Sequence, residues 1–245
     1  MQIYKGDKHM KKIRHIGLVI ADVQEYEPVN VLCKKLGGII SEQYGDKLSV
    51  FEYEKDGNSV KISAVLCGIG KVNAAAATAY LISSEGCDAI INSGLSGGIS
   101  SVRRGDYTVG TEYIEHDFDV SPLGYKRGIK PDQDCYIYQP DKALFKAYEK
   151  INGIISGVMV CGDQFIGSDE AKKQLKSDFK AVSCDMESAA CASVCHKAKV
   201  PFVAVRRISD DAGDMAADSY TEMNNLAEDK LMNVVFMGID NILNL

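Results

Sequence analysis

The chain has 245 residues, of which 46% are hydrophobic and 25% are charged. That length and apolar content are enough to bury a large core, and α/β domains of this size are commonly undivided. The formal net charge is −6 and acidic and basic residues are interspersed, so no basic face is available for a nucleic-acid backbone. No apolar run approaches the roughly 20 residues that span a bilayer. We therefore expect one domain that binds neither nucleic acid nor membrane.

Eight cysteines are present, and all except Cys135 lie in apolar segments. This pattern is typical of reduced, buried thiols and favours a cytoplasmic protein. Cys191 and Cys195 are one helical turn apart beside His196, but no C-x-x-C pair occurs and a structural zinc site needs four ligands at recognisable spacings. We therefore expect no metal site. Residues 1–12 are polar and without a pattern, which predicts a disordered or artificially added leader before a single domain over residues 13–245.

From residue 13 onwards, strand-like apolar runs alternate with amphipathic helical stretches. This alternation predicts an α/β fold in which helices cover a sheet. The predicted strands are residues 13–21, 48–54, 60–67, 88–92, 107–118, 157–161 and 202–208. The predicted helices are residues 23–36, 71–84, 142–151, 169–177, 187–198 and 220–243. Residues 122–139 contain turn formers and no period, which predicts a long functional loop.

Two glycine-rich segments follow predicted strands. Residues 67–74 (CGIGKVNA) lack the spacing of a dinucleotide fingerprint or a P-loop. They predict a tight strand-to-helix turn, for which a structural role is favoured over direct ligand contact. Residues 93–98 (SGLSGG) would form a turn that lets the backbone approach a ligand at the sheet edge where α/β proteins place their sites. The motif alone supports a ligand cradle and a plain turn equally.

Acidic residues stand in three separate strand-end regions. Asp22 and Glu25 follow the first strand, Glu187 begins a helix, and Asp210 follows the last strand. Each residue taken alone also fits a purely structural role: Glu25 as an exposed helix residue, Glu187 as an acid in a first helical turn, and Asp210 as an N-cap. If the strands are parallel, however, the carboxylates gather at one edge, where burial and like charge raise the pKa of at least one. Such a cluster can supply an acid and a base.

Five segments together resemble, in order, the motifs of the 5′-methylthioadenosine/S-adenosylhomocysteine nucleosidases, within the nucleoside phosphorylase/hydrolase superfamily. These segments are residues 68–74, 92–98, 162–166, 185–187 and 207–210. The resemblance extends from residue 13 nearly to the C-terminus. It implies a single domain with a mixed, twisted central β-sheet flanked by helices. It also implies hydrolysis of the N-glycosidic bond of a purine nucleoside to adenine and a 5-thioribose derivative, with no cofactor.

The resemblance assigns two catalytic residues. Asp210 would protonate or hydrogen-bond purine N7 as the general acid, and Glu25 would orient and deprotonate the attacking water as the general base. An oxocarbenium-like transition state needs a better leaving group on one side and a water on the other, which two carboxylates in different environments provide.

The resemblance also assigns substrate-binding residues. Glu187 would accept hydrogen bonds from the ribose hydroxyls, and Met186 would pack beneath the sugar. Phe165 would stack on the purine, and Ile166 would read its edge through backbone groups. The substrate-binding residues predicted in this way are Glu187, Met186, Phe165, Ile166, Leu95, Gly94 and Ser209.

The chain departs from the family pattern at Leu95, where serine is usual, so a hydroxyl near the ribose or the water is absent. Ser93 or Ser96 would have to compensate, and the preferred 5′ substituent stays open. Ser188 in place of the usual glycine after Met-Glu is a milder difference.

Two alternatives remain beside hydrolysis. A purine nucleoside phosphorylase of this fold has arginines in the loop after the first strand and before the glycine-rich turn, because a phosphate dianion demands charge-assisted bonds. Here the first loop is acidic (ADVQEYE) and residues 90–92 are uncharged, which favours water. A purine-binding sensor without turnover is the second alternative.

The resemblance further implies a homodimer in which residues 116–128 of one subunit help to close the 5′ pocket of the other. Phe118, Pro122, Leu123 and Tyr125 on an otherwise polar loop fit this role. Alternatively, they pack on their own subunit.

Overall fold

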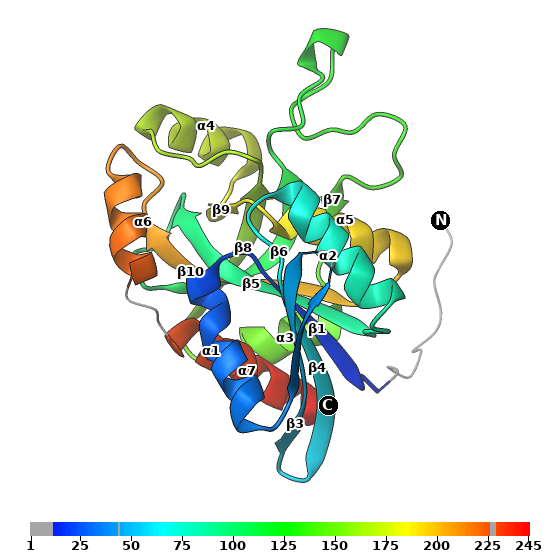
Figure 1. The fold of residues 1–245 in the computed structure, drawn as a ribbon. Coiled ribbons are helices and arrows are strands. Elements are labelled where there is room, and N and C mark those ends of the chain that lie inside the picture. The colour runs from blue at the N-terminus through cyan, green and yellow to red at the C-terminus, as the bar shows by residue number, and fades with distance from the viewer. Residues whose placement is uncertain (1–11, 44, 226–228) are drawn as a thin grey trace.

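The computed structural model describes residues 12–43, 45–225 and 229–245 (Figure 1). Of the predicted leader over residues 1–12, only Lys12 falls within the described residues. The strands are β1 (His15–Ile20), β2 (Ile39–Gln43), β3 (Asp46–Lys55), β4 (Asn58–Leu66), β5 (Ala89–Gly98), β6 (Tyr107–Glu115), β7 (Ile137–Tyr138), β8 (Ile154–Cys161), β9 (Ser183–Asp185) and β10 (Phe202–Asp210). The helices are α1 (Val23–Lys35), α2 (Lys71–Ser83), α3 (Lys142–Glu149), α4 (Asp169–Phe179), α5 (Ser188–Ala198), α6 (Ala216–Asn225) and α7 (Asp229–Leu243), with a short 3₁₀ helix at Ser121–Leu123.

The sheet is mixed and partly closed. Strand β5 runs parallel to both β1 and β10, and β10 pairs on its other edge with β6 in the antiparallel sense. Because β6, β8, β9 and β5 also pair in that order, the strands β5, β9, β8, β6 and β10 form a closed ring. Strands β1, β4, β3 and β2 extend the sheet outward from β5. The predicted α/β fold with a mixed central sheet is therefore confirmed.

Helices cover both faces of this sheet, and each side has its own apolar core. Helices α1, α3 and α7 pack on one face, with Tyr26, Leu144 and Val235 buried there. Helices α2 and α5 pack together on the other face, where their small residues allow close approach, as at Ala74 and Ala189. Every residue of β1 and β10 is buried, which explains the apolar runs at residues 16–20 and 202–205.

The ends of several helices follow from capping residues that the sequence displays. The Asp22 side chain accepts a hydrogen bond from the backbone N–H of Gln24 at the start of α1. The Ser168 side chain accepts one from the backbone N–H of Ala171 at the start of α4. These caps satisfy backbone donors that a first helical turn leaves free. The cap at Asp22 fixes the start of α1 directly beyond β1, and therefore fixes where Glu25 projects.

Two predicted elements are wrong in detail. The glycine-rich residues 93–98 are predicted as a turn but belong to β5, because β10 and β9 pair with this stretch and complete its backbone hydrogen bonds. The single helix predicted over residues 220–243 is described as two helices, α6 and α7. The sequence also fails to predict β2, β7 and β9, which are short or exposed and show no clear alternation.

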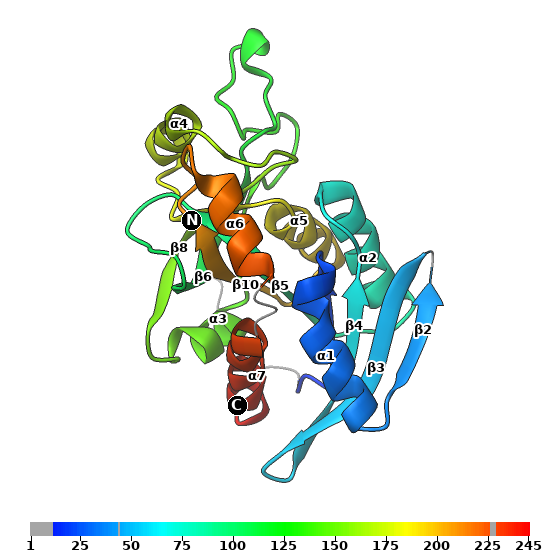
Figure 2. The same ribbon diagram turned by 60° about the vertical axis from the view of Figure 1, so that its left-hand side comes forward.

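The loop between β6 and α3 extends away from the sheet, as Figures 1 and 2 both show. It contains the 3₁₀ helix and β7, and residues 121–126 are all exposed.

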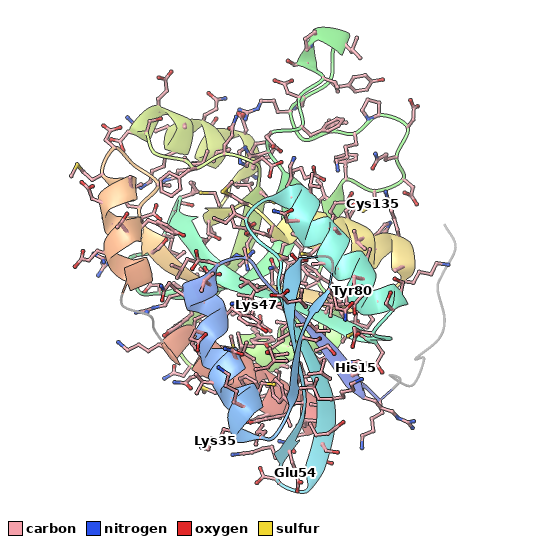
Figure 3. The ribbon with its side chains drawn as sticks, in the orientation of Figure 1. His15, Lys35, Lys47, Glu54, Tyr80 and Cys135 are labelled. Carbon is pink, nitrogen blue, oxygen red and sulfur yellow. The ribbon has the colours of Figure 1, made fainter. Side chains whose placement is uncertain are left out.

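All eight cysteines are free, and seven are buried as their apolar surroundings predict; Cys135 lies on the loop between β6 and α3 (Figure 3). Among the described helices, none is long and apolar enough to cross a membrane.

Candidate active site

A cavity of about 290 Å³ opens at the carboxyl ends of β1, β5 and β10. Segments far apart in sequence line it, including the start of α1, the turn before α2, the loop after β8, the segment after β9, and α6. Of the nine predicted site residues, eight line this cavity: Glu25, Leu95, Phe165, Ile166, Met186, Glu187, Ser209 and Asp210. The sequence therefore predicts residues that the fold brings together.

Gly94 is the exception, because it lies behind Glu25 instead of lining the cavity. A Cβ built on Gly94 would lie 3.0 Å from Glu25 Oε2 and 3.2 Å from Oε1. The missing side chain is therefore the space that the Glu25 carboxylate occupies.

Glu25 lies in the first turn of α1, half-buried beside β5. Its Oε1 accepts a hydrogen bond from the backbone N–H of Leu95 at 2.6 Å. Burial raises the pKa of Glu25 to about 8 and the nearby Glu187 adds to the rise, while the Leu95 hydrogen bond and the charge of Arg206 oppose it. A carboxyl group with such a pKa exchanges protons near neutral pH, which suits a general base.

Glu187 lines the same cavity, but the strand that precedes it does not have the parallel orientation assumed in the sequence analysis. It follows β9, which runs antiparallel to β5, so the parallel-strand condition holds for β1 and β10 but not here. The backbone N–H groups of Glu187 and Ser188 donate to Asp185 Oδ1 at 2.9 and 2.8 Å, which fixes the start of α5. Glu187 Oε1 then accepts from the backbone N–H of Gly70 at 3.0 Å.

Arg206 is a buried cation beneath this cluster that the sequence motifs do not single out. Its side chain is completely buried, its Nε lies 3.3 Å from Asp185 Oδ2, and its Nη2 lies 3.7 Å from Glu187 Oε2. It also donates to the side-chain oxygen of Asn92. Burial raises the pKa of Glu187, and the charge of Arg206 opposes that rise. The sequence signal is an arginine inside the apolar run of β10, because a buried charge requires partners.

Asp210 ends β10 and is buried, with both carboxylate oxygens held. Ser209 Oγ donates to Asp210 Oδ2 at 2.7 Å, and the backbone N–H of Ala212 donates to Oδ1 at 2.8 Å. Burial raises the pKa of Asp210, and these two hydrogen bonds limit the rise. A raised pKa favours the protonated form that a proton donor needs. Ser209, predicted to bind substrate, orients this carboxyl group.

Two aromatic rings stand together at the cavity. Phe165, in the loop after β8, is 49% exposed, and its ring lies 5.7 Å from that of Tyr220 on α6 in an edge-to-face arrangement. Burial and the surrounding carboxylates raise the pKa of Tyr220 to about 12. The sequence pattern places Tyr220 at the start of a helix but does not reveal its role, because the contact depends on how α6 folds back over the sheet.

The turn at residues 67–74 is structural and also contributes to the cavity. Gly68 and Gly70 have φ values of +81° and +103°, a region that side chains other than glycine rarely adopt. The turn exposes Ile69 to the cavity and directs the N–H of Gly70 at Glu187. The turn therefore has the structural role that the sequence favours, since it positions a carboxylate, and direct ligand contact stays a prediction.

Comparison with known proteins identifies the family. Residues 15–237 match the phosphorylase superfamily. The chain belongs to that superfamily. It is 36% identical over 222 residues to the 5′-methylthioadenosine/S-adenosylhomocysteine nucleosidase of Actinobacillus succinogenes, which covers 86% of this chain and 92% of the relative. It is 32% identical over 232 residues to the nucleosidase of the same name from Glaesserella parasuis, covering 92% and 98%. The chain therefore belongs with these nucleosidases.

Solved structures agree with this assignment. The Neisseria meningitidis nucleosidase in complex with methylthio-immucillin-A superposes with a TM-score of 0.81 at 30% identity, covering 93% of this chain and 99% of that one. The futalosine hydrolase of Helicobacter pylori superposes with a TM-score of 0.85 at 25% identity, covering 93% and 98%. The fold is thus shared by enzymes whose names give different nucleoside substrates.

Proposed function

We propose that this protein hydrolyses the N-glycosidic bond of 5′-methylthioadenosine or S-adenosylhomocysteine, and releases adenine and a 5-thioribose derivative. Two relatives of that name match it over nearly their full length. The observation that supports water as the nucleophile is the lining of the cavity. None of the described residues that line it is lysine or arginine, whereas five carboxylates line it: Asp22, Glu25, Asp185, Glu187 and Asp210. Phosphate would meet repulsion there without charge-assisted bonds.

The acid in this proposal is Asp210. As the glycosidic bond lengthens, electrons pass to the purine and N7 becomes more basic, so a protonated carboxyl group at N7 makes the base a better leaving group. Ser209 and the N–H of Ala212 hold the Asp210 carboxyl group in place before the reaction. A fixed group does not have to be ordered during the reaction, which lowers the barrier.

The base is Glu25. In its ionised form it takes a proton from the attacking water as the oxygen approaches the anomeric carbon. Its pKa of about 8 makes this ionised form a stronger base than an ordinary carboxylate, and the population of the ionised form grows as pH rises toward 8. The hydrogen bond from Leu95 leaves the second carboxylate oxygen available to the water.

The remaining residues position the substrate. Glu187 is anchored on one oxygen by Gly70, so the other oxygen can accept from the ribose hydroxyls. Met186 lines the cavity beside it and would pack beneath the sugar. The exposed face of Phe165 is available to stack on the purine, and Ile166 would contact its edge through backbone groups.

A homodimer and a cytoplasmic location complete the proposal. On the extended loop, Leu123 is 73% exposed and Tyr125 is 44% exposed, so both side chains have surface available to a second copy. The eight free cysteines agree with a reducing compartment. Sedimentation at micromolar concentration should give a dimer, and a monomer would contradict this part of the proposal.

Adenine release from 5′-methylthioadenosine, measured with and without phosphate, tests the reaction. Release without phosphate supports hydrolysis. Release only with phosphate would identify a phosphorylase instead. No release from 5′-methylthioadenosine or S-adenosylhomocysteine, with binding retained, would indicate a sensor or a different nucleoside substrate.

A further inference from the structure

Three residues from three separate segments form a closed ring of hydrogen bonds at the base of the extended loop. Lys71 Nζ donates to Asp117 Oδ1 at 2.7 Å, and the backbone N–H of Asp163 donates to Asp117 Oδ2 at 2.9 Å. The backbone N–H of Lys71 then donates to Asp163 Oδ1 at 2.8 Å. Asp117 follows β6, Lys71 begins α2, and Asp163 follows β8. The two oxygens of one carboxylate therefore connect two different loops.

Both connected loops lead directly to the candidate active site. Lys71 is adjacent to Gly70, whose N–H holds the Glu187 carboxylate. Asp163 stands two residues before Phe165. None of the three ring residues lines the cavity, so Asp117 has no direct contact with a substrate bound there.

The surroundings favour a fixed carboxylate at this point. The side chains of Lys71 and Asp117 are 18% and 15% exposed, so solvent screens their attraction less than it would at an open surface. Partial burial alone would raise the pKa of Asp117, but the hydrogen bonds from Lys71 and Asp163 hold it below its usual value. Glu115 accepts a second bond from Lys71 Nζ at 3.1 Å and also pairs with Lys130.

Two glycines allow the segments to approach this closely. A Cβ on Gly70 would lie 3.1 Å from Asp163 Oδ1. A Cβ on Gly162 would lie 2.5 Å from His116 Nε2 and 3.0 Å from Asp117 Cγ. Any larger residue at position 162 would displace the end of β6 or the start of the loop after β8. The absence of side chains at Gly70 and Gly162 therefore permits the close packing on both sides of Asp117.

We propose that Asp117 is a positioning residue that holds the turn at residues 68–71 and the loop at residues 162–167 in fixed relative places. Through Gly70 it sets the Glu187 carboxylate, and through Asp163 it sets the ring of Phe165. The nature of the bound nucleoside rests on the proposed function, but the coupling of the two loops does not. An asparagine has only one acceptor oxygen, so Asp117→Asn must lose one of the two loop contacts.

Amide hydrogen exchange of the ligand-free protein tests the coupling without any assumption about the substrate. In Asp117→Asn, the loop that loses its contact, at residues 68–71 or at residues 162–167, should exchange about tenfold faster than in the wild type, as expected for the loss of one hydrogen bond to a charged group. Asp178→Asn is the matched control. It removes a carboxylate that pairs at 3.6 Å with Arg127 on the same extended loop, and it should leave the exchange of residues 68–71 and 162–167 unchanged.

Kinetics of adenine release test the consequence. Because the contacts concern substrate placement and not proton transfer, KM should rise about tenfold in Asp117→Asn while kcat changes less than about threefold. A merely structural role would lower the amount of active enzyme and reduce kcat at constant KM.

The proposal fails if both loops exchange as in the wild type, or if Asp178→Asn accelerates both loops equally. If Asp117→Asn does not fold, Lys71→Met tests the proposal instead. This variant keeps the backbone N–H of Lys71 and removes only the contacts of its Nζ. Unchanged amide exchange in Lys71→Met overturns the proposal. If the wild type releases no adenine, the proposed function fails while the exchange experiment still decides the coupling.

Discussion

The Glu25 carboxylate on α1 is held by the backbone N–H of Leu95 on β5, with 2.6 Å between oxygen and nitrogen. The contact joins residues 70 positions apart and uses the main chain of Leu95, not its side chain. Leucine at the position where the resemblance leads us to expect serine therefore leaves the anchor of the proposed general base intact. What the substitution removes is a hydroxyl at the cavity surface, which Leu95 lines.

The space behind Glu25 leads to a prediction for Gly94→Ala. The added methyl group would lie 3.0 and 3.2 Å from the two carboxylate oxygens, so the carboxylate must shift by a few tenths of an ångström, and we expect this shift to disturb its hydrogen bond with the Leu95 N–H. We expect kcat to fall by about 10²-fold, approaching the loss of a general base, with KM for 5′-methylthioadenosine little changed. Leu95→Ser is the control, since it keeps the backbone contact, and its kcat should stay within about tenfold of the wild type. A larger loss in Leu95→Ser than in Gly94→Ala would contradict this account.

Asp210→Asn should separate proton transfer from orientation. Asparagine can occupy the same place but has no acidic proton, so kcat should fall by at least about 10²-fold. Ser209→Ala keeps the carboxyl group and removes only the 2.7 Å hydrogen bond, so its loss should be nearer tenfold. Steady-state adenine release under identical conditions compares the two. Equal activity of Asp210→Asn and the wild type would remove Asp210 from the acid role.

The sequence predicts which residues gather at the candidate site better than it predicts the strands around them. Glu25 and Asp210 follow apolar runs that are buried strands, and parallel pairing of β1, β5 and β10 brings their ends together. For these two residues, the apolar pattern of the preceding segment is enough to predict that they lie at the edge of the sheet. Glu187 is also predicted, but by motif and not by geometry, because β9 is a three-residue strand that has no periodicity to detect.

What the sequence misses depends on long-range packing. Arg206 lies in a run that its neighbours mark as buried, and its carboxylate partners come from β9 and the segment after it. Tyr220 meets Phe165 only because α6 crosses the carboxyl end of the sheet. The glycine-rich stretch of β5 looks like a turn by composition, yet pairing on both edges makes it a strand. None of these relationships is encoded within one sequence window.

The aromatic pair at the cavity gives a prediction for binding. Tyr220→Ala removes a ring that contacts Phe165 edge-to-face at 5.7 Å, and such pairs contribute about 0.5–1.5 kcal/mol beyond area burial. Phe165 would then be less fixed, and KM should rise roughly threefold to tenfold with a smaller change in kcat. Tyr220→Phe keeps the ring and should restore the wild-type KM. If both variants raise KM equally, the hydroxyl group and not the ring is the important part.

The raised pKa of Glu25 predicts that the protein loses stability at this residue as pH rises. The pKa is about 8 in the folded protein, against an ordinary value of 4.5. Below pH 4.5 both the folded and the unfolded state hold the proton, so Glu25 does not lower the free energy of unfolding through its pKa shift. Between pH 4.5 and about 8 the unfolded state releases the proton while the folded state retains it, so the free energy of unfolding falls with pH; above about 8 both are ionised and the loss is complete.

Glu25→Gln should therefore gain stability over the wild type as pH rises through this window. A tenfold difference in proton affinity between the folded and unfolded states corresponds to about 1.4 kcal/mol, and water in the cavity reduces the effect, so the gain at pH 9 should be on the order of 1–3 kcal/mol. Thermal unfolding of both proteins at pH 4.5, 7 and 9 measures it, and Glu27→Gln on the exposed face of α1 controls for the loss of one negative charge. A difference between Glu25→Gln and the wild type that stays constant across this range would mean that burial does not raise the pKa of Glu25. A growing difference, with kcat reduced at least about 10²-fold, would show that the protein keeps a destabilising carboxyl group because the reaction requires it.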